Sequence, residues 1–140
     1  MRSEAHTIRS TVGRARPGRA APRRNVRPWR TLAACGGDAT LFYKNDLDSD
    51  DLTRHRVTKA KAVCKGCPVR PQCAAYALAV TEPYGIWGGF TESERARLIA
   101  IDWRKYADRA CTRVDVAQLQ ARLRAMRAEE RFTATLRSMA

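Results

Sequence analysis

No apolar stretch in this chain of 140 residues comes near the roughly 20 residues that a membrane-spanning helix requires. The first residues also lack the apolar segment of a secretory signal peptide. Regular alternation of apolar and polar residues, which marks a half-buried strand, is equally missing. These absences predict a cytoplasmic, all-α protein without membrane association.

Acidic residues are also scarce, with 14 Asp and Glu against 27 Lys and Arg, which leaves a net charge of +13. A charge of this size favours an anionic partner such as DNA over a surface that is basic only for solubility. The imbalance is greatest in residues 1–30, which hold nine Arg and one acidic residue, Glu4. We therefore interpret residues 1–27 as a disordered basic tail.

Part of this tail resembles a DNA-binding motif. The segment Arg14-Ala15-Arg16-Pro17 is similar to the core of an AT-hook, but a hook has glycine where Ala15 stands. A translation start nearer Val26 would remove the tail, and its prolines argue against a mitochondrial transit peptide. General contact with DNA phosphates is the favoured interpretation, through Arg14, Arg16, Arg23 and Arg24.

Apolar periodicity and capping residues predict four helices in the rest of the chain. We expect them at 50–63 with Ser49 as N-cap, at 68–81, at 91–110, and from Asp115 onward. The third opens with the capping box Thr91-x-x-Glu94. The second should turn one face inward, made of Val69, Cys73, Tyr76, Ala77 and Val80. The fold class is therefore a small all-α domain of four to five short helices.

Four of the five cysteines follow the spacing Cys-x28-Cys-x2-Cys-x5-Cys, at Cys35, Cys64, Cys67 and Cys73. Because structural disulfides are rare in a reducing cytosol, these thiols are better interpreted as metal ligands. A structural zinc site commonly uses two Cys-x2-Cys pairs, so the asymmetric set favours an iron–sulfur cluster, with zinc and a redox-active dithiol as alternatives. We expect Gly66 to help aim amides at sulfur, and Cys111 to be a small apolar residue on its helix.

A glycine-rich turn, Gly85-Ile86-Trp87-Gly88-Gly89, separates the second and third helices. Glycines allow positive φ angles and remove neighbouring bulk, so the turn can present the Trp87 indole to a partner. The alternative is that Trp87 fills the core between two helices. For the adjacent Phe42 and Tyr43, we expect one ring in the core and the other on the surface.

These motifs resemble the WhiB-like proteins of actinobacteria and their phages. The resemblance covers about residues 28–100 and rests on Trp29-Arg-Thr-Leu-Ala-Ala-Cys35, Asp38-Ala-Thr-Leu-Phe-Tyr43, Ala62-Val-Cys-Lys-Gly-Cys-Pro-Val-Arg-Pro-Gln-Cys73, Tyr76-Ala-Leu78 and the Trp87 turn. Two positions depart from the pattern: Lys44 stands where many relatives have proline, and Tyr43 where Phe is common.

The resemblance implies a helical domain at 28–110 that holds a [4Fe-4S] cluster through Cys35, Cys64, Cys67 and Cys73. It also implies a transcriptional regulator, not an enzyme, that docks on the C-terminal region of the primary sigma factor. The docking residues carried over by motif are Phe42, Tyr43 and Trp87.

The hypothesis is thus a regulator with a redox- or nitric-oxide-sensitive cluster, which acts as a monomer in a 1:1 complex with the sigma factor and also contacts promoter DNA. A basic helical segment at 111–140 offers further DNA-contact candidates, Arg122, Arg124 and Arg127, unless these form only a solvated face. Two alternatives remain: a protein-disulfide reductase that uses Cys64 and Cys67 in the apo form, and a zinc-stapled DNA-binding module.

Overall fold

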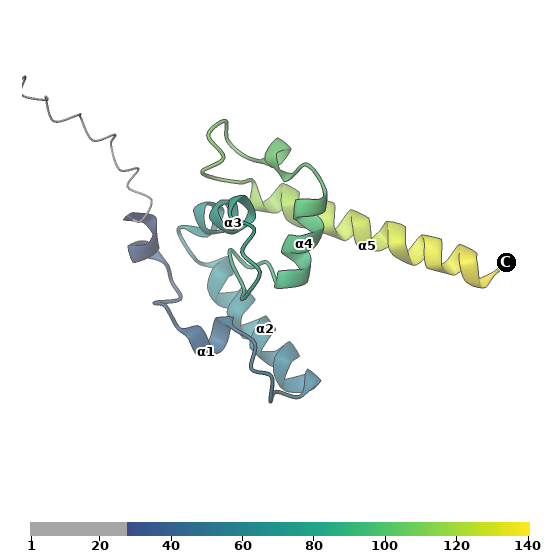
Figure 1. Cartoon of the computed structure of the whole chain (residues 1–140), viewed down its shortest axis with the longest axis horizontal. Coiled ribbons are helices and arrows are strands. Elements are labelled where there is room, and N and C mark those ends of the chain that lie inside the picture. Colours follow the sequence, from purple (N-terminus) through teal and green to yellow (C-terminus); the bar gives the residue numbers. More distant parts are fainter. Residues whose placement is uncertain (1–27) are drawn as a thin grey trace, which may run out of the picture.

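The computed structural model describes residues 28–140, and within this range it contains helices and no named strand. This confirms the predicted all-α class. The basic tail at 1–27, with Arg14, Arg16, Arg23 and Arg24, lies outside the described residues. In chain order the elements are η1 (Pro28–Leu32), α1 (Ala39–Phe42), α2 (Asp50–Lys65), α3 (Arg70–Ala79), α4 (Glu92–Ala100), η2 (Trp103–Tyr106) and α5 (Val116–Ser138), as Figure 1 shows.

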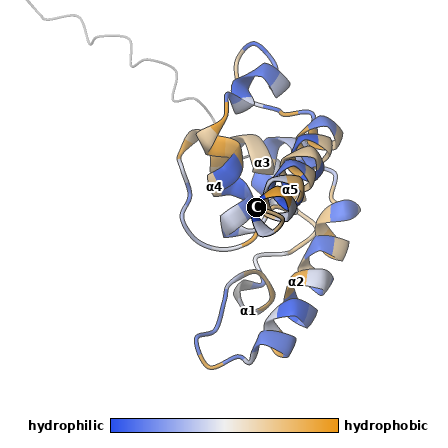
Figure 2. Cartoon of the chain, turned by 90° about the vertical axis from the view of Figure 1, so that its right-hand side faces the viewer, coloured by the Kyte–Doolittle hydropathy of each residue, from blue (hydrophilic) through white to orange (hydrophobic). Residues whose placement is uncertain are grey.

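The start of α2 follows the prediction. The Ser49 hydroxyl accepts a hydrogen bond from the Leu52 N–H at 3.3 Å, and Asp50 and Asp51 occupy the first turn, where carboxylates suit the helix dipole. The helix continues to Lys65, so Cys64 lies inside its last turn. Figure 2 shows hydrophilic residues over much of α2, and its buried residues are Ala60 and Cys64.

Helix α3 is shorter than the predicted range 68–81. It begins at Arg70, with Val69 as N-cap, and it ends at Ala79 because Thr81 adopts a left-handed conformation with φ of 55°. The predicted inward face is wrong at Val80, which is 51% exposed. Val69 and Ala77 of that face are buried as predicted, and the helix packs through four buried side chains, those of Ala74, Ala75, Ala77 and Leu78.

The expectation of one helix over 91–110 is wrong beyond Ala100. Ile101 is extended, with φ of −105° and ψ of 171°, and this residue redirects the chain. The short helix η2 then places Trp103 in the core with 2% exposure. Cys111 is therefore not helical: it lies in a turn with φ of 55° and packs, half-buried, against the core.

Helix α5 starts as predicted, with the Asp115 carboxylate accepting from the Gln118 N–H at 3.0 Å. Leu119 and Leu123 are its buried residues, and from Arg124 onward most of the helix is exposed and extends beyond the body of the molecule (Figure 1). Despite this length, α5 and the other described helices are not apolar enough to cross a membrane.

Two clusters of buried side chains make up the interior of the described region. The larger joins α3, α4, η2 and α5 and contains Ala74, Ala75, Leu78, Phe90, Leu98, Trp103, Val114, Leu119 and Leu123. The smaller joins α1, α2 and the Trp87 turn and contains Phe42, Ala60, Cys64 and Ile86. Because Ile86 belongs to one cluster and Phe90 to the other, the turn between α3 and α4 links the two cores.

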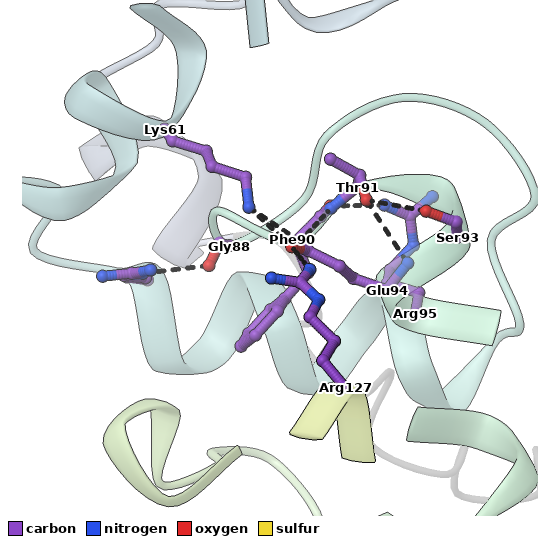
Figure 3. A network of polar contacts seen from close by, with 9 residues as sticks. Lys61, Gly88, Phe90, Thr91, Ser93, Glu94, Arg95 and Arg127 are labelled. Atoms are coloured by element: carbon purple, nitrogen blue, oxygen red, sulfur yellow. Dashed lines mark hydrogen bonds and ion pairs between the residues drawn. The ribbon is translucent and has the colours of Figure 1, made fainter. Parts of the chain in front are cut away.

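Glu94 ties three helices together (Figure 3). It completes the predicted capping box of α4 by accepting from the Thr91 N–H at 2.9 Å. The same carboxylate accepts from Lys61 of α2 at 2.7 Å and from Arg127 of α5 at 2.8 Å. Glu94 is 6% exposed, so these bonds satisfy a charge that would otherwise be buried at high cost.

Burial by itself would raise the pKa of Glu94, but the hydrogen bonds from Lys61 and Thr91 and the Arg127 contact hold its pKa below the usual value of 4.5. A carboxyl whose pKa is lower in the folded state stabilises the fold above its unfolded pKa. That contribution is lost as the pH falls through the folded pKa.

We predict that Glu94→Gln lowers the free energy of unfolding by about 1–3 kcal/mol at neutral pH, because hydrogen bonds to a charged group are lost. The difference in unfolding free energy between parent and variant should become smaller as the pH falls below about 4.5. Urea unfolding followed by circular dichroism checks this. The control, Glu129→Gln, removes an exposed ion pair with Arg122 and should change the free energy of unfolding little. A destabilisation by Glu94→Gln that stays constant with pH would contradict the prediction.

Candidate functional site

The four spaced cysteines line one cavity of about 250 Å³. Cys35 follows η1, Cys64 lies in the last turn of α2, Cys67 in the turn before α3, and Cys73 on α3. The cavity wall is completed by aromatic and apolar side chains that include Trp29, Val69 and Trp87. The fold thus gathers around one space the thiols that the sequence set apart from the fifth, Cys111.

Backbone amides point at three of these sulfurs. The Ala34 N–H donates to Cys67 Sγ at 3.5 Å, and the amides of Gly89 and Gly88 donate to Cys64 and Cys73. The expectation for Gly66 is wrong, because its φ is −94° and its amide donates to the Cys64 carbonyl. The donors come from the loop before Cys35 and from the glycine-rich turn, which are remote in sequence.

Burial raises the pKa of Cys73 to about 12, and it also raises the pKa of Cys64, with a smaller contribution from the neighbouring thiols. The amide donors and the Arg70 charge near Cys64 act in the opposite direction. Thiolates gathered in a buried space call for a positive centre, and a bound metal supplies one. The chemistry of this donor set therefore fits a metal group.

The four thiols lie around a cavity and are not gathered at one point. Within residues 28–140, no group of three or more Cys, His, Asp or Glu side chains is placed to hold one metal ion. A four-cysteine zinc site needs its sulfurs about 2.3 Å from one common point. Four thiols spread around a cavity suit a ligand of several atoms, such as an iron–sulfur cluster.

Glycine is required in the Trp87 turn because other parts of the chain lie too close for a side chain. Gly85, Gly88 and Gly89 have φ angles of 77°, 58° and 79°, which favour glycine. A Cβ on Gly88 would lie 2.6 Å from the Ala74 Cβ and 2.8 Å from the Ala74 amide nitrogen. The turn thus packs directly on the backbone of α3, one residue from Cys73.

Arg95 of α4 fixes the same turn, a role that was not predicted from the sequence. Its side chain is 1% exposed and donates to the carbonyls of Gly85 at 2.5 Å and Phe90 at 2.8 Å. It also donates to those of Glu82 at 3.0 Å and Tyr84 at 3.1 Å. An arginine after the capping box looks like a surface residue in the sequence, so no local signal identified it.

An aromatic row stands at the edge of the cavity. The Tyr76 ring lies 5.9 Å from Trp29 and 5.7 Å from Trp87, and the Trp87 Nε1–H donates to the Tyr84 carbonyl at 2.9 Å. The Arg30 guanidinium lies over all three rings, at 4.5 Å from the Tyr76 centroid. Trp87 is half-buried, so its indole neither fills the core nor lies fully in solvent.

The two adjacent aromatics take different places, as expected. Phe42 is 6% exposed and belongs to the smaller core, whereas Tyr43 is 41% exposed and its ring packs against Gly85. The Phe42 carbonyl accepts from the Ile86 N–H at 2.8 Å. Of the predicted docking residues, Tyr43 and Trp87 thus reach solvent, while Phe42 supports the turn from below.

The C-terminal arginines have unequal surroundings. Arg127 pairs with the buried Glu94, and Arg122 pairs with Glu129 at 3.3 Å. Arg124 is exposed and lines a small groove of about 260 Å³ with Lys61 and Arg127. This groove joins basic side chains from α2 and α5, which lie far apart in the sequence.

We predict that Gly88→Ala destabilises the protein by about 2 kcal/mol or more, because the new methyl group meets the α3 backbone and φ is positive. Gly66→Ala is the matched control, since its φ is negative and nothing lies within 4 Å of its Cβ position. Equal unfolding midpoints for the two variants in urea would contradict this reading of the turn.

Comparison with known families matches residues 29–98 to the family described as Transcription factor WhiB. Similar curated proteins include the transcriptional regulator WhiD of Streptomyces coelicolor, 48% identical over 79 residues, which are 56% of this chain and 70% of WhiD. The redox-responsive transcriptional regulator WhiB3 of Mycolicibacterium smegmatis is 40% identical over 87 residues, 61% of this chain and 91% of that protein. The transcriptional regulator WhiB2 of Mycobacterium tuberculosis is 58% identical over 71 residues, 50% of this chain and 72% of that protein. The chain therefore belongs to the WhiB family of transcription factors.

Proposed function

We propose that this chain is a transcriptional regulator whose Cys35, Cys64, Cys67 and Cys73 hold a [4Fe-4S] cluster, and that it acts in the cytoplasm. The observation that carries the proposal is the cavity of about 250 Å³ that all four thiols line, with backbone amides donating to three of them. When bound, the cluster supplies a centre that responds to redox state or nitric oxide. The three relatives reported above are each named a transcriptional regulator, and the name of one of them, WhiB3, includes a redox response.

The four ligands differ in how firmly the chain holds them. Cys64 and Cys73 lie on helices that belong to the two cores, whereas Cys35 lies in a turn between η1 and α1. Cys35 is therefore the ligand that we expect to detach first. Its release would free the segment that carries Trp29 and Arg30, which pack beside Trp87.

For the partner, we propose the C-terminal region of the primary sigma factor, bound as one chain per sigma. Tyr43 and Trp87 lie on the face that carries the cavity, and the Trp87 turn is fixed by Arg95 and by the packing of Gly88 on Ala74. A rigid aromatic side chain makes a good interface anchor because little conformational entropy is lost on binding.

For DNA, we propose phosphate contacts by Arg124 and by the arginines of residues 1–27. Arg124 is exposed and lines the groove between α2 and α5, whereas Lys61 and Arg127 are engaged by Glu94, and Arg122 by Glu129. Contacts of this kind depend on charge and carry no sequence information.

The geometry gives less support to the two alternatives. A thioredoxin-type dithiol sits at a helix N-terminus after a strand, but Cys64 lies in the last turn of α2 and no named strand occurs within residues 28–140. A zinc staple needs one point that all four sulfurs can reach, and these thiols instead surround a cavity.

Anaerobic co-expression with the primary sigma factor tests the whole proposal. We predict a brown complex with about four iron and four sulfide per chain. Cys73→Ser should lose both, whereas Cys111→Ser should keep them, because Cys111 is remote from the cavity lining. DNA affinity of the complex should fall steeply with salt. A colourless protein that contains zinc, or a coloured one that does not bind sigma, would contradict it.

We predict that Trp87→Ala keeps iron and visible absorbance but weakens sigma binding by about tenfold or more, because an anchoring indole is lost. The control is Tyr84→Ala in the same loop, since the Tyr84 side chain is 67% exposed and Arg95 and Trp87 donate only to its backbone carbonyl. Titration calorimetry under anaerobic conditions measures both. Equal affinity of Trp87→Ala and the parent would remove Trp87 from the interface.

A further inference from the structure

Arg30 is held on the surface by aromatic rings. Its guanidinium carbon lies 4.5 Å from the centroid of Tyr76, 5.3 Å from that of Trp29 and 5.8 Å from that of Trp87. These rings come from η1, α3 and the turn before α4, so the position of Arg30 exists only in the folded protein. The residue is exposed and lines the mouth of the cysteine cavity.

Within the described part of the chain, Arg30 has no carboxylate partner. Asp38 lines the same cavity, but its carboxylate accepts from Thr40 Oγ1 at 2.7 Å and from the Thr40 amide at 3.0 Å, at the start of α1. Among residues 28–140, no side-chain hydrogen bond to the Arg30 guanidinium is formed either. Within this range its charge is held in place by the rings and is not paired with a carboxylate.

Cation–π contact uses the flat face of a guanidinium and leaves the N–H groups on its edge free. Those groups form a planar fork that fits the two oxygens of a carboxylate. Stacking on rings also restricts the long arginine side chain before any partner arrives, so less entropy is lost when a bond forms. Arg30 thus combines an open donor edge with a preset orientation.

We infer that Arg30 is a carboxylate-recognition residue on the docking surface, where it pairs with an Asp or Glu side chain of the bound protein while Trp87 packs against that protein's apolar side chains. This inference rests on the proposed sigma docking. It assigns to the partner one acidic residue within hydrogen-bond reach of Arg30. Arg30 would then contribute specificity as well as affinity, because a partner without that carboxylate would leave the guanidinium unpaired on docking.

The test measures binding of the cluster-loaded chain to the C-terminal region of the primary sigma factor. We predict that Arg30→Gln weakens binding about tenfold or more and reduces its dependence on salt. Arg30→Lys should be intermediate, because it keeps the charge but loses the planar fork. Arg104→Gln is the matched control: Arg104 is exposed and lies 4.9 Å from the Trp103 ring centroid, but away from the cavity, so its loss should leave binding unchanged.

A second measurement leaves this chain intact and so remains informative if an Arg30 variant loses its cluster. Each Asp and Glu of the sigma fragment is changed in turn to Asn or Gln. One of these variants should weaken binding to the parent and have no further effect on binding to Arg30→Gln. If folded Arg30→Gln binds sigma as tightly as the parent, or if the sigma scan finds no such residue, the inference about Arg30 is overturned. The proposed docking would then still stand. A parent chain that does not bind sigma would overturn the proposed docking and the inference with it.

Discussion

The rest of the described structure depends on the hydrogen bonds that the buried Arg95 guanidinium donates to carbonyls of the segment 82–90. A buried charge is tolerated when hydrogen bonds satisfy it, and here four backbone carbonyls do so. The segment that it holds supplies Ile86 to one core and Phe90 to the other. The same segment directs the amides of Gly88 and Gly89 at two thiols and presents Trp87. One side chain therefore fixes the two cores, the cavity and the Trp87 turn together.

The first turn of α4 also bonds to the turn before it and to two other helices. Glu92 accepts from the Gly85 N–H at 2.8 Å, and Glu94 joins α2 and α5 through Lys61 and Arg127. Helix α5 lies outside the residues that match the family, yet Leu119 and Leu123 belong to the larger core. The described part of this chain thus adds a helix to the family region and anchors it at the turn that holds the candidate site.

Features with local causes could be predicted from the sequence. The caps at Ser49, Thr91 and Asp115 were identified because a capping side chain bonds to an amide two or three residues away. The end of α4 at Ala100 was missed because no glycine or proline marks it. There the burial of Trp103 decides the path of the chain, and burial depends on helices elsewhere in the sequence.

The sequence by itself determined the helical class, the set of four spaced cysteines and the glycine turn, since spacing, periodicity and permitted φ angles are properties of short segments. Only the tertiary structure decided which amides face the sulfurs, which of Phe42 and Tyr43 is buried, and what surrounds Arg30 and Arg95. Those outcomes join segments that are remote along the chain. Packing of whole helices sets such distances, and no local propensity encodes them.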